Sequence, residues 1–372
     1  MSLFLLQSLV YTTVFFLATN FSGLSSFWNE NTSGRETDGR KLFMGSKHHR
    51  RREQQVSIDT NRYDMAVLIA YFNPIGYVRT TMNVLYVINK LRRDGYPLFV
   101  AEVSLQGKDY TLAPEQRQLS VKTDSVLFYK ENIFNMLERT IPSRYQKVVF
   151  MDCDVEFTSP NWYQFTSVLL ETNDVVQPFQ VAHWMNVNYS VVIRERFSYL
   201  NVSSHLTEED RLNLKTAPPS HEGFAWAFRR PLFQAMGGMP EFAVLTGGDT
   251  IVALAVSPIS TRTRFFLHQL PYLRASVRAY NEKVQAAFDT LGVVPGKRTV
   301  SSTPGIIRHL FHGSRSRRRY DLFEIHKMFI NMGFTLNATY EDVNGLYRYH
   351  DPLRWNKIFF DYFASRLEDN VD

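Results

Sequence analysis

Apolar residues in this chain gather in short runs that are separated by turn-forming residues. The first run is Asp64 to Phe72 (DMAVLIAYF), which ends at Asn73-Pro74 and Gly76. Residues 80–92 carry apolar positions at helical spacing, and a second apolar run covers residues 98–103. A strand, a helix and a strand in this order form the unit of a parallel sheet, whose ligand site lies at the carboxyl ends of the strands.

The same alternation continues along the chain. It predicts strands at 126–129, 147–151 and 174–179, and helices at 131–140 and 251–256, whereas residues 186–220 are expected to be irregular. The sequence has no internal repeat and no sustained heptad pattern. We therefore expect an α/β protein with a mostly parallel sheet flanked by helices.

The amino-terminal part differs in composition from the rest. Residues 1–21 include an uncharged apolar run about long enough to cross a bilayer, at roughly 20 residues, so we expect a transmembrane anchor or a signal sequence. Residues 22–62 are polar and read as a flexible basic stem. The compact domain is expected over residues 63–345, with a helical extension over residues 346–372.

Most of the positive charge lies in the stem. Residues 35–52 hold seven Lys or Arg and two Asp or Glu, which accounts for most of the formal net charge of +6. The domain that follows is nearly neutral, whereas a nucleic-acid binder spreads positive charge over a folded face. We therefore expect no nucleic-acid partner. A basic stem beside an apolar helix is instead typical of contact with anionic lipid or of a solvated linker.

Cysteine use and glycosylation sequons bear on the compartment. The single cysteine, Cys153, excludes an internal disulfide and is expected to pack as a small apolar residue. Asn-x-Ser/Thr sequons begin at Asn20, Asn31, Asn188, Asn201 and Asn337. With the apolar amino terminus, they favour a glycoprotein of the secretory route, either a single-pass type II membrane protein with a lumenal catalytic domain in the Golgi or ER, or a secreted protein if the apolar segment is cleaved.

Two aspartates follow the strand at 147–151 with one residue between them. Residues i and i+2 of a strand point to the same face, so Asp152 and Asp154 can converge on one point at the strand's carboxyl end. Hard cations accept such carboxylates and fill their other positions with water and phosphate oxygens. A solvated turn after the strand is the competing interpretation, because Asp-x-Asp is a short and common pattern.

Six segments occur together in an order that resembles one enzyme family. They are NPIG at 73–76, KENIFN at 130–135, MDCDVEF at 151–157, HEGFAWAFRR at 221–230, GGDT at 247–250 and LFHGSRSRRRY at 310–320. In this order they resemble the family-2-like GT-A glycosyltransferases of bacteria, large DNA viruses and some algae, over about Met65 to Tyr320. The resemblance implies a GT-A type, Rossmann-like mixed sheet and transfer of a sugar from a nucleoside-diphosphate donor to a glycan or glycoprotein acceptor.

The resemblance also implies site residues. The metal set would be Asp152, Asp154 and His312, with Asp154 as direct ligand and Asp152 turned toward the ribose or the metal's water shell. The metal would be Mn²⁺ or Mg²⁺, and an imidazole ligand suits Mn²⁺ better. Asp249 would be the catalytic base of an inverting transfer, although an aspartate that opens a helix is also typical of an N-cap.

The remaining implied contacts surround the donor and the sugar. The residues expected to bind the donor are Asn73, Lys130, Gln177 and Arg315. The residues expected to form the sugar or acceptor pocket are His221, Glu222, Gly223, Trp226 and Gly248. Two competing interpretations remain. Arg315 could belong to a solvent-exposed run of arginines (SRSRRRY, 314–320), and Trp226 could pack in the core.

Two other functions stay open at this point. One is a catalytically inactive relative that binds a glycan, and the other is a metal-dependent nuclease or phosphotransferase that uses the same carboxylates. The nearly neutral domain and the lack of a G-x-x-x-x-G-K-[ST] motif disfavour the second. The donor sugar, the acceptor and the choice between inversion and retention are left open.

Overall fold

The computed structural model describes residues 63–207, 219–314, 317 and 322–371. The chain divides between Val56 and Ser57, and all described residues belong to the second unit, Ser57–Asp372. The expected anchor and stem at 1–62 therefore lie outside the described residues. No helix within the described part is long and apolar enough to cross a membrane.

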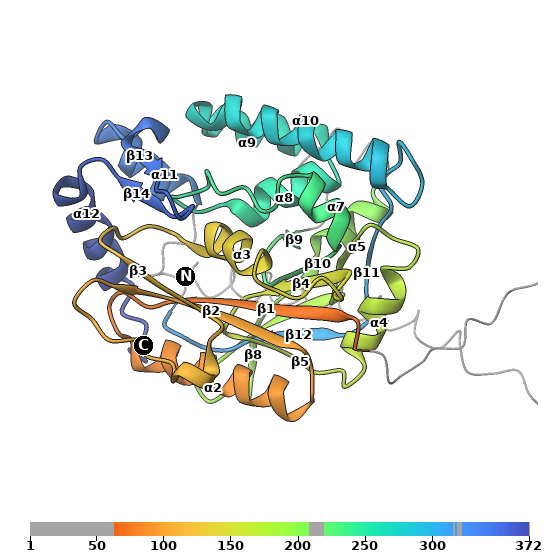
Figure 1. Ribbon diagram of the computed structural model, residues 1–372, viewed down its shortest axis with the longest axis horizontal. Coiled ribbons are helices and arrows are strands. Elements are labelled where there is room, and N and C mark those ends of the chain that lie inside the picture. Colours follow the sequence, from red (N-terminus) through yellow and green to blue (C-terminus); the bar gives the residue numbers. More distant parts are fainter. Residues whose placement is uncertain (1–62, 208–218, 315–316, 318–321, 372) are drawn as a thin grey trace, which may run out of the picture. The chain divides into compact units, whose positions relative to one another are not determined.

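A mixed sheet forms the centre of this unit (Figure 1). Its seven described strands lie in the order β11-β6-β10-β4-β1-β2-β3, and only β10 runs antiparallel to its neighbours. The strands are β1 (Met65–Phe72), β2 (Leu98–Leu105), β3 (Leu119–Thr123), β4 (Lys147–Met151), β6 (Val175–Gln177), β10 (Ala225–Arg229) and β11 (Val300–Ser302). The expected α/β class with a mostly parallel sheet is confirmed.

A second sheet lies beside the first and carries part of the site described below. Its described order is β5-β12-β7-β8-β9, and a separate hairpin joins β13 to β14. These strands are β5 (Val155–Phe157), β7 (Val181–Met185), β8 (Val192–Ser198), β9 (Ser220–His221), β12 (Ile306–His309), β13 (Thr339–Glu341) and β14 (Tyr347–Tyr349).

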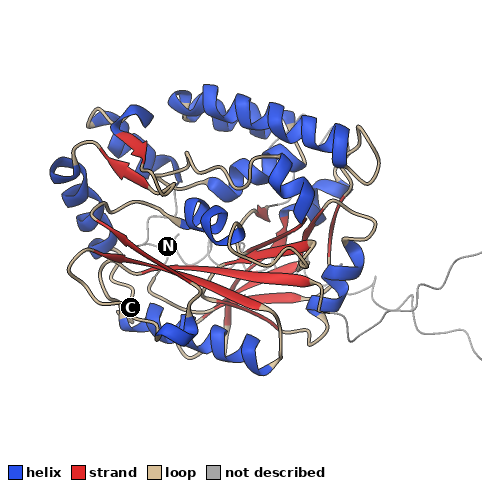
Figure 2. Ribbon diagram, viewed as in Figure 1, coloured by secondary structure: helices blue, strands red, loops and turns tan. Residues whose placement is uncertain are grey.

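Helices lie on both sides of the strands (Figure 2). The α-helices are α2 (Val78–Arg93), α3 (Lys130–Glu138), α4 (Trp162–Leu169), α5 (Tyr199–His205), α7 (Arg230–Ala235), α8 (Gly248–Val256), α9 (Ser260–Gln269), α10 (Arg274–Leu291), α11 (Leu322–Asn331) and α12 (Pro352–Ser365). Short 3₁₀ turns are η2 (Pro114–Gln116), η3 (Pro271–Leu273) and η4 (Leu336–Ala338).

Strand alternation divides the core into two clusters. In β1, Ala66 and Leu68 pack in a cluster with α3, α7, α8 and α10, whereas Val67 and Ile69 pack in a second cluster with α2 and α4. Successive strand residues point to opposite faces, and every residue of β4 is buried, which is typical of a central strand covered on both faces. Helices therefore cover the central sheet on both faces and hold its strands in place.

The carboxyl-terminal residues belong to the same core. Residues 346–372 contain the helix α12, and its Trp355, Phe359 and Phe363 are buried in the cluster that includes Phe329 of α11. Phe329 and Phe359 have ring centroids 4.2 Å apart. The residues of α12 are thus packed into the same core as the strands and helices before them.

Two expected elements differ in the structure. Residues 126–129 form no strand, because Phe128 N donates to Val244 O and Val126 N to the Asn356 side chain. The strand in this region is β3, which ends at Thr123. The segment expected to be irregular, 186–220, contains β8 and α5 as well as the start of β9. In both places tertiary contacts override the local sequence pattern.

Candidate active site

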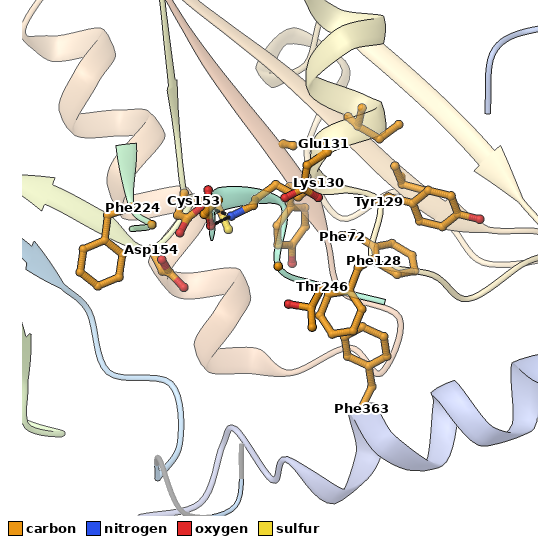
Figure 3. Close-up of a pocket in the computed structure, with 18 of the residues that line it drawn as sticks. Phe72, Phe128, Tyr129, Lys130, Glu131, Cys153, Asp154, Phe224, Thr246 and Phe363 are labelled. Carbon is orange, nitrogen blue, oxygen red and sulfur yellow. Dashed lines mark hydrogen bonds and ion pairs between the residues drawn. The ribbon is translucent and has the colours of Figure 1, made fainter. Parts of the chain in front are cut away.

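A cavity of about 340 Å³ lies at the carboxyl ends of β1, β2 and β4. Figure 3 shows its two ends. Asp154 and Phe224 lie at one end, Phe72, Phe128 and Phe363 at the other, and Lys130 and Glu131 come between them. The cavity therefore offers a polar end with carboxylates and an aromatic end.

The polar end contains a cluster of three metal-ligating side chains, Asp154, His309 and His312. The Asp154 Oδ2 atom lies 2.9 Å from His312 Nε2 and 3.7 Å from His309 Nε2, and the two Nε2 atoms are 3.0 Å apart. Both histidines are buried. Three donors thus point at one place from separate parts of the chain.

Strand pairing brings these donors together. In the antiparallel pair of β12 and β5, His309 lies opposite Val155, the residue after Asp154, and Leu310 N donates to Asp154 O over 2.8 Å. His309 is also stacked on Phe224, with ring centroids 5.0 Å apart and an interplanar angle of 17°. The backbone register and the aromatic contact both hold the imidazole in place.

The cluster fits a divalent transition metal. Donors held at about 2.1 Å from one ion lie about 3 to 3.5 Å from each other, close to the spacings found here. Two imidazoles and one carboxylate suit Mn²⁺, Fe²⁺ or Zn²⁺ better than Mg²⁺, which prefers oxygen ligands. Asp154, His309 and His312 are the residues that would hold the ion.

Asp152 lies outside this three-residue cluster. Its Oδ1 atom accepts from Lys130 Nζ over 3.2 Å, and the same Nζ lies 2.5 Å from Asp249 Oδ2. One lysine therefore links the first aspartate of the pair to the predicted base. Burial raises the pKa of Asp152 to about 6, helped by the nearby Asp249 and Asp154 carboxylates and opposed by Lys130.

Lys130 is the first residue of α3 and lines the cavity. Burial lowers its pKa, but the carboxylates of Asp152, Asp249 and Glu131 outweigh burial and hold the pKa well above its usual value. The side chain is therefore a permanent cation. It was expected to contact the donor phosphates, and here it already lies between two carboxylates of the site.

Asp249 occupies the first turn of α8. The N-cap is Gly247, with φ of +92°, so Asp249 is not the helix cap. A carboxylate in the first turn is favoured by the helix dipole, and this one faces the cavity beside Gly223. Gly248 packs so closely on Glu131 that an added Cβ would lie 2.5 Å from Glu131 Cγ.

Glu131 is a carboxylate that the sequence reasoning missed. It is buried, lines the cavity and follows Lys130 in α3. Burial raises its pKa to about 7, opposed by Lys130 and helped by Asp249 and Asp152. Cys153 also lines the cavity, and burial with the adjacent aspartates raises the pKa of its thiol well above the usual value, which disfavours the thiolate.

His221, Gly223 and Phe224 form one wall of the cavity. Phe224 has φ of +79°, a left-handed conformation that is rare for a bulky residue, and its ring lies 4.0 Å from that of His221. Such strained residues concentrate at functional sites. Thr246, with φ of +131°, is a second strained residue of the lining.

Two residues expected in the sugar pocket, Trp226 and Glu222, and one expected to bind the donor, Gln177, make contacts within the fold. Trp226 is buried in the core and donates from Nε1 to Glu222 O over 2.8 Å. Glu222 forms an ion pair with Arg262 at 3.6 Å and burial raises its pKa. Gln177 is fully buried and accepts from Leu200 N over 2.8 Å. None of these three residues is part of the described cavity lining.

Two further donor-binding predictions have different outcomes. Asn73 lies in the turn after β1, where its Oδ1 accepts from Gly76 N at 3.1 Å and Tyr77 N at 3.0 Å, so it orders the turn outside the cavity lining. Arg315 lies outside the described residues. A described arginine that does line the cavity is Arg366, from the far end of the chain.

His309 was also missed, although the sequence carries a signal for it. The run His309-Leu-Phe-His312 ends a short apolar strand with two histidines, a common source of metal ligands. Arg366 and Phe363 had no comparable signal, because they reach the cavity only through the packing of α12.

Comparison with known proteins gives structural likeness only. No family model matches the chain, and no curated protein matches it. Among solved structures, the catalytic domain of Drosophila β1,4-galactosyltransferase 7 in complex with xylobiose is 12% identical over 52% of this chain and 61% of that chain, with a TM-score of 0.28. The chain thus spans less than two thirds of that structure.

Two bacterial enzymes match over more of the chain. Mannosyl-3-phosphoglycerate synthase from Rubrobacter xylanophilus is 12% identical over 80% of this chain and 89% of that chain, with a TM-score of 0.35. Glucosyl-3-phosphoglycerate synthase from Mycobacterium tuberculosis, in complex with Mn²⁺, UDP and phosphoglyceric acid, is 10% identical over 77% and 86%, with a TM-score of 0.31. Because these TM-scores lie below 0.5, the function proposed below rests on the geometry of the site.

Proposed function

We propose that this chain is a metal-dependent glycosyltransferase that moves a sugar from a nucleoside-diphosphate donor to a hydroxyl of a glycan or glycoprotein. The observation that carries the proposal is the cavity itself. It combines the Asp154–His309–His312 cluster, of which Asp154 and His309 line the cavity, with a second carboxylate, Asp249, and an aromatic end. Metal ligands, a base and an apolar surface for a nucleoside are the groups that this reaction needs.

A divalent cation bound by Asp154, His309 and His312 would supply positive charge to the diphosphate of the donor. Phe72, Phe128 and Phe363 lie at the other end and give the nucleoside base an aromatic surface (Figure 3). His221 and Gly223 flank Asp249, and Gly223 leaves room because an added Cβ would lie 3.1 Å from Asp249 Oδ2. The sugar would then lie between the two ends.

The transfer proposed is an inverting displacement. The acceptor oxygen forms a bond to the anomeric carbon while the bond from that carbon to the diphosphate oxygen breaks. The acceptor proton passes to the Asp249 carboxylate, and the nucleoside diphosphate leaves with the bonding electrons. Lys130 contacts both Asp249 and Asp152 and so keeps the two carboxylates in position.

The test is to incubate the purified full chain with a panel of nucleotide sugars and Mn²⁺ and to measure release of nucleoside diphosphate. We expect metal-dependent release that falls about 10²- to 10⁴-fold in Asp249→Asn, the range for loss of a general base. Asp154→Ala is expected to abolish the metal-dependent release. Asp94→Asn, an exposed carboxylate paired with Lys90, is the matched control and should retain full activity.

Other outcomes would overturn the proposal. Binding of glycans with no turnover of any donor would indicate an inactive glycan-binding relative. Cleavage of labelled oligonucleotide with no turnover of nucleotide sugars would indicate a nuclease. Full activity in Asp249→Asn would remove the base assignment while leaving the enzyme class in place.

The acceptor and the compartment are part of the same proposal. A lumenal domain behind an amino-terminal anchor would meet glycan or glycoprotein acceptors. Two sequon asparagines in the described part, Asn188 and Asn337, are exposed and so accessible to glycosylation. Expression in a eukaryotic cell with glycosidase treatment checks the compartment: a mass shift that is reduced in Asn188→Gln with Asn337→Gln supports it, and no shift in the parent chain contradicts it.

A further inference from the structure

The last described residues of the chain return to the metal-ligating cluster. After α12 ends at Ser365, the buried Glu368 (4% exposed) places its Oε2 atom 3.2 Å from His312 Nδ1. The other imidazole nitrogen, Nε2, lies 2.9 Å from Asp154 Oδ2. His312 is thus held between two carboxylates, one on each ring nitrogen.

Glu368 is itself fixed on both oxygens. Its Oε2 accepts from Thr80 Oγ1 over 2.8 Å, and its Oε1 lies 2.5 Å from the Arg366 guanidinium. Arg366 balances the charge of the buried carboxylate and also lines the cavity. A carboxylate with both oxygens occupied can hold an imidazole in one orientation.

The segment around Glu368 is anchored to α2. Tyr77 Oη donates to Phe363 O and Ala364 O, at 2.8 and 2.9 Å, and accepts from Leu367 N. The Asp369 carboxylate accepts from Val78 N and Arg79 N, at 3.0 and 2.8 Å, so it satisfies the first turn of α2. Figure 1 shows the end of α12 beside the start of α2.

The loop that carries His312 is shaped for this contact. Gly313 has φ of +89°, and an added Cβ would lie 2.8 Å from Glu368 Cα. Only glycine allows both the left-handed backbone and the close approach of the two segments. The His312-Gly313 pair and the segment Arg366–Asp369 therefore fit together as one unit.

We infer that Glu368 is a positioning residue of the metal site, and that the segment Arg366–Asp369 completes this site from the end of the chain. The inference rests on the metal role proposed above for Asp154, His309 and His312. The Glu368 carboxylate beside Nδ1 favours the tautomer of His312 that carries its proton on Nδ1 and leaves the Nε2 lone pair facing Asp154 and His309. Outer carboxylates of this kind typically contribute about 10- to 100-fold in metal affinity.

The test measures metal binding directly in the full chain. Titration with Co²⁺, followed by visible absorption, and with Mn²⁺, followed by calorimetry, gives the dissociation constants. We expect Glu368→Ala to weaken both about 10- to 100-fold and Glu368→Gln to fall between Glu368→Ala and the parent chain, since an amide oxygen still accepts from Nδ1. Asp361→Asn on the exposed face of α12 is the matched control and should bind as the parent does.

Thermal unfolding without metal separates positioning from folding. If Glu368→Ala lowers the unfolding temperature but binds Co²⁺ with the parent's affinity and spectrum, Glu368 is only structural and the inference is wrong. If the parent chain binds neither ion, the metal site proposed above fails and this inference fails with it. Weakened binding in Glu368→Ala with an unchanged unfolding temperature supports it.

Discussion

At the scale of single residues, Gly248 shows how closely the site is packed. A methyl group at this position would overlap the side chain of Glu131, which is buried and would have to shift. We expect Gly248→Ala to destabilise the protein by about 1–3 kcal/mol, the usual cost of overpacking, although alanine is the better helix former. Urea unfolding followed by circular dichroism measures the change.

A second substitution isolates the cause. In a Glu131→Ala background the overlap is absent, so Gly248→Ala should cost less than about 0.5 kcal/mol there or even stabilise α8. The difference between the two backgrounds is the coupling between Gly248 and Glu131. Equal costs in both backgrounds would show that another contact makes glycine necessary.

The two aspartates of the Asp-x-Asp pair show how far single residues could be predicted. Their position at the end of a buried strand follows from the apolar run 147–151, and the structure places both in the cavity. Their different partners, Lys130 for Asp152 and the histidines for Asp154, depend on α3 and β12. Sequence spacing alone does not encode which distant element reaches each carboxylate.

At the scale of elements, the packing of α11 on the loop before α8 depends on a neutral histidine. His326 of α11 is fully buried, accepts from the Tyr272 hydroxyl at Nδ1, and donates from Nε2 to Thr246 O at 3.3 Å. Burial lowers its pKa to about 4, opposed by the Thr246 bond. Thr246 lines the cavity, so this contact supports the site as well as the fold.

The lowered pKa predicts a loss of stability in acid. The unfolded chain binds the His326 proton below about pH 6.5, whereas the folded chain binds it only near pH 4. The free energy of unfolding contributed by His326 is therefore complete above pH 6.5 and falls as the pH drops to 4, by roughly 3 kcal/mol at most. Urea unfolding at pH 7, 6 and 5 measures this slope.

A variant separates His326 from other groups. Asp152 and Glu131 have raised pKa values and contribute a slope of the opposite sign, so only a comparison with His326→Asn is informative. We expect the parent to lose more stability than this variant between pH 7 and pH 5. Parallel slopes in the two proteins would contradict a buried neutral histidine.

Elements with a strong repeating pattern were predicted closely, and those set by tertiary contacts were not. The strand at 147–151 and the helix at 80–92 match β4 and α2 within a few residues. The block 221–230 gave no sign of a strand, yet it contains β10, which runs antiparallel between β6 and β4. A short, mostly apolar segment near glycine does not by itself indicate a strand, and the direction of β10 follows from the strands with which it pairs.

At the scale of the whole molecule, the described fold and site are built from residues after 62. Both apolar clusters, the seven-stranded sheet and the donors Asp154, His309 and His312 come from the unit Ser57–Asp372. Glu368 adds a contact from the end of the chain, about sixty residues after His312 in sequence order. The proposed metal site therefore draws on residues of this unit from Asp154 to Glu368.

This arrangement predicts that a chain beginning at Ser57 folds and binds metal as the full chain does. We expect its free energy of unfolding to agree within about 0.5 kcal/mol and its Co²⁺ affinity to be unchanged, because the described core and the proposed metal donors all lie after residue 62. A chain beginning at Asn73 lacks β1, which pairs with β2 and β4 at the centre of the sheet, and should not fold. Loss of cooperative unfolding in the chain from Ser57 would show that residues 1–56 contribute to the core, and the boundary at Val56 would then be wrong.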